Sequence, residues 1–377
     1  EGYLSTLYGS NGRRAALTGS VDAGLPLAGG RAAWRLQGTY LNGGDRSTAH
    51  YLLNNTGVRE ANGSVAFGWK RDRFEADGYY SLFSTRIGVL FSAQMGDEQL
   101  LRERIRLGRP TEFYPWTRQI DYPYQKVVHQ VAKLHTRYTL SSGGHLEWQA
   151  AFQHDDRREF NQRRNFRSHV PTLDLQLESF QTDGRWQQAY ADHWTTEAGL
   201  FYANVKNTNT PGTGVVPIIP NYVQQNAGVF AIQKYSGDNW GAEAGARLDH
   251  QRLNARGIDL YGRPYGKLDH YNNLTYTVGA HAHLLPGLDV LSNVGSAWRA
   301  PHVHELYSNG VEHSSGLFAR GDANLRPEVS TKWITSLRYA NHGFTASVDG
   351  YVQWIDNYIF DAPTSEVITM VSGAYPV

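Results

Sequence analysis

Hydrophobic and polar residues alternate along most of the chain with a period of two, which is typical of β-strands with one apolar and one polar face. Between residues 240 and 249, for example, the apolar positions from Trp240 to Leu248 alternate with polar positions such as Glu243 and Arg247. We count about fourteen such segments, each about ten residues long or more. Strands of that length are about twice the usual globular length and match the length needed to cross a bilayer at a tilt.

The connections between these segments alternate between short and long. The short ones lie at residues 70–73, 141–144, 236–239, 285–287 and 341–343, and the long ones at 87–122, 155–171, 206–223, 253–271 and 300–329. Outer-membrane barrels have short periplasmic turns and longer outer loops, whereas a soluble sandwich has no reason to keep this order. We therefore predict an all-β fold, an antiparallel transmembrane β-barrel with long outer loops and short periplasmic turns.

The tryptophans indicate which face meets lipid. Most of those in the predicted strands share the apolar positions, and several lie close to a strand end: Trp34, Trp69, Trp148, Trp194, Trp240, Trp298, Trp333 and Trp354. Because Trp and Tyr concentrate at the membrane–water interfaces, we interpret them as girdles rather than as the core of a soluble β-protein. Charged residues on the polar face, such as Arg35, Glu75 and Asp249, would cost about 2–4 kcal/mol each at the membrane midplane, so we expect that face to line the barrel interior.

Composition narrows the chemistry. The chain has 377 residues, a net charge of +1 and no cysteine. The balanced charge does not indicate the excess of basic residues that nucleic-acid binding needs. The absence of cysteine excludes disulfides, thiolate catalysis and zinc sites with cysteine ligands. We find no nucleophile elbow, phosphate loop or His-Glu-x-x-His motif, so we do not expect an enzyme.

One segment breaks the β pattern. Residues Asp97–Leu107 place Leu100, Leu101 and Ile105 among charged residues. This spacing predicts a short amphipathic helix within a long outer connection, where it would pack on the barrel rim.

The stretch richest in metal-binding side chains is residues 298–328. It contains three histidines with carboxylates, a tyrosine and arginines: His302, His304, His313, Glu305, Glu312, Tyr307, Arg299 and Arg320. Imidazole, carboxylate and phenolate groups bind iron, zinc or haem. His302 and His304 lie two residues apart near a strand end, and they can equally point to opposite sides without binding a metal.

The same stretch resembles the TonB-dependent outer-membrane receptors, whose barrels carry the pattern FRAP … LY … NPNL-x-PE. The matching residues are Trp298, Arg299, Ala300, Pro301, Leu306, Tyr307, Asn324, Leu325, Pro327 and Glu328. Two departures are Trp298 in place of Phe, and Asp322–Ala323 in place of Asn-Pro, which loses a proline-fixed turn. The segments Asp77–Ser84, Pro123–Gln125 and Phe152–Arg164 also look similar to iron-complex receptors, so the resemblance spans most of the chain.

The resemblance implies a receptor in the outer membrane of a Gram-negative cell. It would import a scarce metal complex, a ferric siderophore or haem, using energy from the TonB-ExbB-ExbD complex, with no permanently bound cofactor. It also implies a 22-stranded barrel around an N-terminal plug. On this interpretation residues 1–377 form an incomplete barrel of about 14–16 strands, without the plug, its TonB-contacting segment (the TonB box) and the last strands. The expected partners are outer-membrane lipid, the TonB complex and the metal complex.

The ligand stays open at this point. In haem receptors of the family a histidine lies between the two halves of the pattern, which makes His313 the candidate ligand by position, with His302 and His304 as alternatives. A siderophore would instead contact aromatic and arginine side chains such as Tyr80, Arg86 and Tyr114. The alternative function, from another class, is a passive porin or sugar channel with the same strands but no plug.

Overall fold

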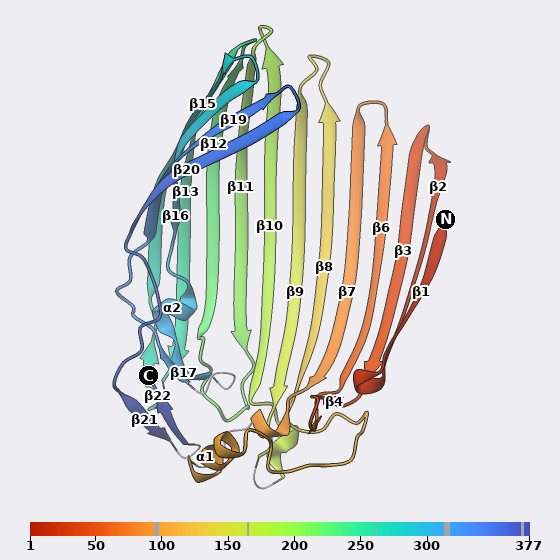
Figure 1. The fold of residues 1–377 in the computed structure, drawn as a ribbon, viewed down its shortest axis with the longest axis vertical. Helices are drawn as coiled ribbons and strands as arrows, with labels where there is room; N and C mark the ends of the chain where they lie inside the picture. The colour runs from red at the N-terminus through yellow and green to blue at the C-terminus, as the bar shows by residue number, and fades with distance from the viewer. Residues whose placement is uncertain (94–97, 164–165, 260, 313–316, 371–372) are drawn as a thin grey trace.

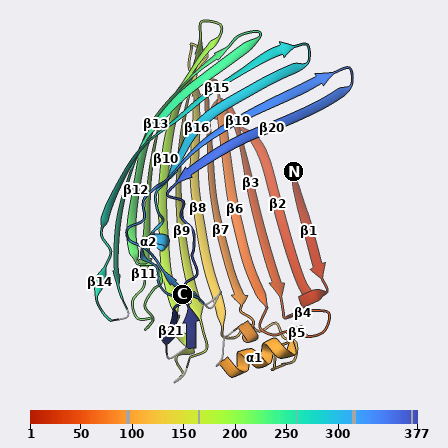
Figure 2. The same ribbon diagram turned by 60° about the vertical axis from the view of Figure 1, so that its left-hand side comes forward.

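The computed structural model describes residues 1–377 except 94–97, 164–165, 260, 313–316 and 371–372. Sixteen strands form one antiparallel sheet, in which each long strand pairs with the next long strand along the chain. The sheet curls into the wall of a barrel (Figure 1; Figure 2). Within the described residues the order runs from β1 to β20, which are the two edges of the wall.

The elements are as follows. The sheet consists of β1 (Gly2–Gly9), β2 (Arg14–Leu27), β3 (Gly30–Gly43), β6 (Val58–Arg71), β7 (Phe74–Gly88), β8 (Tyr124–Thr139), β9 (His145–Phe160), β10 (Leu173–Tyr190), β11 (Trp194–Asn209), β12 (Asn221–Ser236), β13 (Trp240–Ile258), β14 (Pro264–Tyr265), β15 (Leu268–Leu285), β16 (Leu288–Arg299), β19 (Glu328–Asn341) and β20 (Phe344–Asp356). Three small hairpins pair β4 (Arg46–Ser47) with β5 (Leu52–Leu53), β17 (Asn309–Glu312) with β18 (Leu317–Arg320), and β21 (Val367–Met370) with β22 (Gly373–Pro376). The α-helices are α1 (Glu98–Leu107) and α2 (Val303–Tyr307), and short 3-10 helices lie at Asn11–Arg13, Phe91–Ala93 and Arg167–His169.

The predicted antiparallel barrel with alternating connections is confirmed. All five predicted short links are turns between consecutive strands, and Figure 1 shows these turns at one end of the wall and the long connections at the other. The hydrophobic pattern missed two further turns, at residues 28–29 and 191–193. Ala28 and Asp192 adopt positive φ angles of 50° and 52° there. Alanine rarely adopts this conformation and aspartate does so only in a minority of cases, so neither residue marks a turn by itself.

Several strands run further toward the long connections than predicted. Strand β9 continues to Phe160 rather than ending at Asp155, and β15 begins at Leu268 rather than Tyr271. The main strands other than β1 have 12 to 19 residues, whereas about 9–11 residues cross a bilayer. Beyond the bilayer both faces of a strand can meet water, so hydrophobic alternation no longer marks where the strand ends. The predicted helix is confirmed as α1.

The strand register separates an apolar from a polar face. Leu248 lies opposite Val229 and Leu274, while its neighbour Arg247 lies opposite Thr275 on the other face. Leu248 and Leu274 are more than half exposed (57% and 59%), and such a continuous exposed apolar surface is typical of a barrel wall that meets lipid. Among the described helices, none is long and apolar enough to cross a membrane.

Trp298 departs from the predicted outer girdle. The pairing of β15 with β16 ends at Thr277–Gly295. Beyond that point the indole N–H of Trp298 donates to Asp249, at 3.3 Å, on the polar face. The girdle interpretation is therefore wrong for Trp298, because beyond the last β15–β16 pair its side chain can turn past the free edge of β16 toward Asp249 of β13.

Candidate functional site

Residues 300–312 and 317–327, here called the return loop, fold back onto the polar face of the wall. Its helix α2 buries Val303 and Leu306 completely or almost so, against Leu253 of β13 and Tyr222 of β12. Leu253 lies on the same face as Arg247 and Gln251, since the three are separated by even numbers of residues along β13. The loop therefore occupies the inner side of the wall, near the long connections.

An arginine clamp holds the two ends of the return loop together. Arg299, at the end of β16, donates to Glu305 of α2 at 2.7 and 2.8 Å and to Glu328 of β19 at 2.7 Å. Glu328 also accepts from the backbone N–H of Ile359 at 2.7 Å. Arg299 and Glu328 belong to opposite halves of the recognised sequence pattern, so the pattern encodes the closure of this loop. Charge-assisted, forked hydrogen bonds of this kind fix geometry as well as adding stability.

His302 caps helix α2. Its Nδ1 accepts from the backbone N–H of His304 at 3.1 Å, while Glu305 accepts from the backbone N–H of His302 at 2.6 Å. This reciprocal arrangement satisfies helix N–H groups that would otherwise lack partners. Burial lowers the pKa of His302, which keeps its ring neutral. Burial alone would raise the pKa of Glu305, but the hydrogen bonds from Arg299 and His302 lower it.

The departure from Asn-Pro in the pattern is compensated by a side chain. Asp322 accepts from the backbone N–H of Asn324 at 2.9 Å, and its own N–H donates to the carbonyl of Glu305. An aspartate turn of this type replaces the turn that proline would fix. It presents Leu325, which packs against the buried cluster around α2.

A polar hollow of about 590 Å³ lies beside the clamp. It is lined by Asn226, Arg247, Asp249, Trp298 and His302, among others. The Arg247 guanidinium donates to both carboxylate oxygens of Asp249 at 2.8 and 2.9 Å. Gly228 makes room for this pair, because a Cβ there would lie 2.4 Å from the Asp249 carboxylate. The arrangement offers hydrogen-bonding groups of both kinds to a polar ligand.

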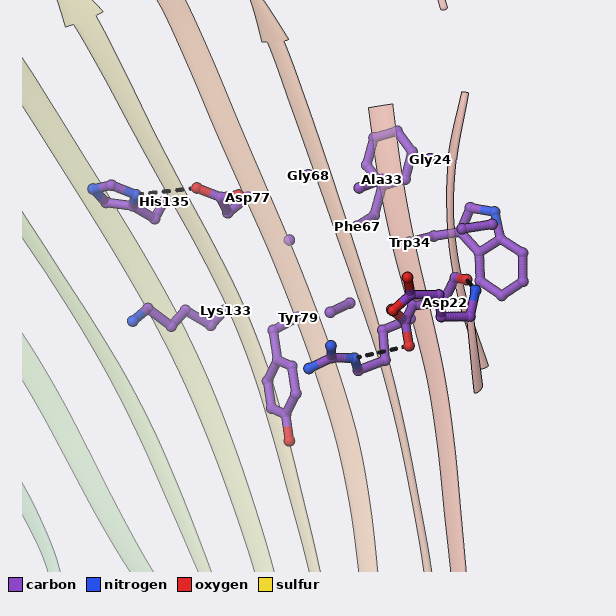
Figure 3. A pocket seen from close by; sticks show the side chains of 15 residues that line it. Asp22, Gly24, Ala33, Trp34, Phe67, Gly68, Asp77, Tyr79, Lys133 and His135 are labelled. Carbon is purple, nitrogen blue, oxygen red and sulfur yellow. Dashed lines mark hydrogen bonds and ion pairs between the residues drawn. The ribbon is translucent and has the colours of Figure 1, made fainter. Parts of the chain in front are cut away.

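A second hollow of about 910 Å³ lies on the polar face near the short turns (Figure 3). Asp22 pairs with Arg35 at 3.7 Å and Asp77 with His135 at 3.6 Å, and Lys133 also lines it. Both pairs join residues on neighbouring strands. This surface is suited to contact with a polar protein surface or water rather than with lipid.

Residues 44–57 are tied to the described residues of the next long connection, 89–93 and 98–123, and we call the two together the rim platform. Asp45 is 1% exposed and accepts from the backbone N–H groups of Thr56 and Thr117, at 3.1 and 3.3 Å. Asn55 is 2% exposed, and the two N–H groups of its side-chain amide are shared among three carbonyls, those of Val89, Asp121 and Pro123, at 2.7–3.1 Å. Sequence reasoning missed both residues, because single Asp and Asn residues in a loop carry no distinguishing signal.

The other predicted residues do not gather at one point. The Tyr307 hydroxyl donates to Asp269 at 2.9 Å, and burial together with that carboxylate raises its pKa. Arg320 makes two hydrogen bonds to Glu366, at 2.7 and 2.9 Å. The ring of His304 contacts Glu312 at 3.2 Å. His313 lies outside the described residues.

Three predicted residues lie on or near other strands. Tyr80 of β7 has the parity of the apolar face, opposite Val65, and its hydroxyl donates to Gln130. Tyr114 belongs to the rim platform, where it exchanges hydrogen bonds with Asn54. Arg86 lies at the base of that platform and donates to the carbonyl of Ile120 at 3.0 Å. Among the described residues no three or more His, Asp or Glu side chains gather in a way that would hold a metal ion.

Comparison with known proteins agrees with this architecture. The sequence profile of the TonB dependent receptor-like, beta-barrel family matches residues 3–372. No curated protein sequence matches the chain. Solved structures with a similar fold include the hemophore receptor HasR of Serratia marcescens, in complex with its hemophore HasA and haem (16% identity, TM-score 0.67), the copper transporter OprC (16%, 0.68) and the siderophore receptor PirA of Pseudomonas aeruginosa (13%, 0.64). Each similarity covers 100% of this chain but only 58%, 55% and 59%, respectively, of the other.

Proposed function

Since this chain belongs to the TonB-dependent receptor family through its β-barrel domain, we propose that it forms the barrel wall of an outer-membrane receptor that imports a scarce metal complex. The observation that carries the proposal is the return loop. Two residues of its sequence pattern, Arg299 and Glu328, form the arginine clamp with Glu305 on the inner face of the wall. The ligand class we propose is a ferric siderophore or haem.

In this proposal the chain is one part of a longer protein. The remaining strands would close the wall, and a plug would fill the interior, contacting polar surfaces such as the hollow around Asp77 and His135. The chain spans little more than half the length of the similar receptors, which supports this division. Energy would come from the TonB-ExbB-ExbD complex acting on the plug. Family membership favours this receptor over a passive porin or sugar channel.

The two versions of the proposal, with haem or with a ferric siderophore as the ligand, assign ligand binding to different residues. Haem would take an axial histidine, for which His313 is the candidate by its position in the sequence. A siderophore would contact polar and aromatic groups of the inner face, such as Arg247, Asn226 and the residues around them in the hollow beside the clamp. Tyr80 is left out of this version, because it has the parity of the apolar face.

A growth experiment tests the proposal. A strain lacking the full-length gene is compared with the complemented strain under iron limitation, with haem or single ferric siderophores as the only iron source. We expect one class of complex to support growth of the complemented strain alone. Equal growth of both strains on every complex would contradict the proposal.

A substitution separates the two versions. If haem is the ligand, His313→Ala lowers haem binding by at least tenfold, because an axial bond is lost, while His342→Ala in the turn between β19 and β20 serves as the control. Unchanged haem affinity in His313→Ala and in the matching His304→Ala and His302→Ala variants would remove the haem version and leave the siderophore version.

A further inference from the structure

A row of four cationic side chains crosses four neighbouring strands at the long-connection end of the wall. Arg59 of β6 lies directly opposite Arg86 of β7, Arg86 opposite Lys126 of β8, and Lys126 opposite Arg158 of β9. Directly opposed residues share one face of a sheet, and like charges at such positions destabilise the pairing. Three like-charged pairs in succession therefore call for an anion that offsets their repulsion.

Carboxylates of the protein neutralise the positive charge of the row at one end only. Arg158 pairs with Asp156 and Asp174, at 3.1 and 3.5 Å. Within the described ranges, no carboxylate lies within 4.0 Å of the cationic groups of Arg59, Arg86 or Lys126. Arg59 and Lys126 are exposed. The row therefore presents an excess of positive charge to whatever lies outside it.

The row has the parity of the lipid-facing side. Along β7, Arg86 is separated by even numbers of residues from Leu82 and Tyr80, and Tyr80 lies opposite Val65 on the exposed apolar face. Arg86 lies four residues, or about 13 Å of strand, beyond Leu82 toward the long connections. On an outer-membrane barrel that height lies just outside the apolar belt, at the headgroups of the outer leaflet.

Aromatic packing holds the centre of the row in place. The Arg86 guanidinium lies 3.9 Å from the centre of the Tyr124 ring, and that ring stacks on Phe160 at 4.5 Å. Arg86 also donates to the carbonyl of Ile120, and Arg59 donates to that of Arg118. These contacts hold both arginines at the edge of the rim platform, so little side-chain entropy remains to be lost on binding an anion.

From this geometry we propose that Arg59, Arg86, Lys126 and Arg158 form a binding site for the phosphate groups of the phosphorylated glycolipid in the outer leaflet. Phosphate accepts forked hydrogen bonds from guanidinium groups and a point contact from lysine. The inference rests on the membrane orientation in the proposed function, and on nothing about the transported complex. The role of this binding site would be to anchor the rim platform against the outer leaflet.

The test measures lipid binding to the full-length receptor, purified in detergent, by native mass spectrometry. The probes are bisphosphorylated lipid A, the same lipid with its phosphates removed, and inorganic phosphate. We expect the wild type to retain the bisphosphorylated lipid, to release it at high salt, and to retain neither of the other two probes to the same extent. Equal retention of the dephosphorylated lipid would overturn the proposal, because acyl chains alone would then explain binding.

Two variants and a matched control complete the experiment. Each neutralised cation near an anionic lipid surface is expected to weaken binding about fivefold, so R59Q/R86Q/K126Q should lose roughly 100-fold and K126Q about fivefold. Lys126 is exposed and its side chain has no hydrogen bond or ion pair with the residues that the structure describes, so K126Q stays informative if the triple variant folds poorly. Arg157→Gln is the control, since Arg157 lies next to the row but on the inner face, paired with Glu159.

The result can be separated from the fate of the proposed function by measuring iron uptake on the same variants. Wild-type lipid retention in K126Q and the triple variant would contradict the inference even if uptake were normal. Reduced uptake with unchanged lipid retention would also contradict it, and would assign the row to the transported complex. Phosphate-dependent lipid binding by a receptor that imports no iron complex would leave the inference intact and remove only the proposed function.

Discussion

The rim platform and the return loop lie at the same end of the wall, but they are held by different means. The platform is tied by Asp45 and Asn55, which are almost fully buried and bond mostly to backbone groups. The return loop is tied by Arg299, whose side chain is 43% exposed and bonds to two carboxylates. Buried backbone contacts make a stiff support, whereas a partly exposed ion pair is screened by water and more easily broken.

The difference teaches that polar residues in loops of one barrel serve two purposes. A buried amide with four partners fixes one conformation, since any loosening leaves several polar groups unsatisfied. A half-exposed clamp beside a polar hollow can open at moderate cost. The platform is therefore suited to hold its shape. In the return loop the buried apolar contacts of α2 stay fixed, and only the clamp is suited to open.

The largest effect is expected at Asn55. In Asn55→Asp, a carboxylate would face the three carbonyls that now accept from the amide, which should destabilise the platform by about 3–5 kcal/mol. Hydrogen exchange of residues 98–123 in the purified receptor would measure this as lost protection. The control is Asn239→Asp at an exposed position in the turn between β12 and β13, where the expected loss is about 1 kcal/mol or less. Equal protection in Asn55→Asp and wild type would break the proposed contrast.

Arg299→Ala tests the clamp. The loss of its hydrogen bonds to Glu305 and Glu328 should destabilise the return loop by about 1–2 kcal/mol, a moderate value because the pair is partly exposed. Amide hydrogen exchange should become faster at residues 303–307 and stay unchanged in the rim platform. Arg71→Ala, which removes an exposed pair with Asp72 in the turn between β6 and β7, should leave both regions unaltered. Rim-platform loosening in Arg299→Ala would show that the two regions are not independent.

The smallest effect concerns pH and His302. Because its pKa in the folded protein is lowered by burial, the folded state favours the neutral ring. The unfolded loop takes up a proton as pH falls below about 6.5, so stability is full above that pH and is lost toward the lowered folded value. His304, Glu305 and Arg299 are the charged or titratable groups that act on His302.

Exchange of the α2 amides at pH 7.5 and pH 5.5 would measure this loss. His302→Asn keeps a capping acceptor but cannot titrate, so its α2 protection should change less between the two pH values. A pH response of the same size in His302→Asn and wild type would assign the effect to Glu305 or His304 instead.

Period-two alternation and the order of short and long links predicted the fold well, because each strand must put apolar residues toward lipid and polar ones inside. The same rule fails at strand ends, where both faces meet water, as at Phe160 and Leu268. It also fails at Trp298, where β16 has left β15.

The candidate site was less accessible from sequence. The ordered pattern located the return loop, but it did not reveal that His302 caps a helix or that Tyr307 bonds to Asp269. Asn55 acts through contacts with residues 34 to 68 positions away in sequence, and the Arg86 row depends on the register of four strands. Such long-range arrangements arise only when the strands are paired, so a local pattern cannot show them.

The most direct test of the central claim is energy-dependent uptake. Cells with the full-length receptor are given the radioactive iron complex that supports growth, with tonB intact or deleted. The account predicts saturable uptake that requires TonB, because a plugged barrel opens only when work is done on the plug. Equal and unsaturable uptake in both strains would contradict it and identify a passive channel.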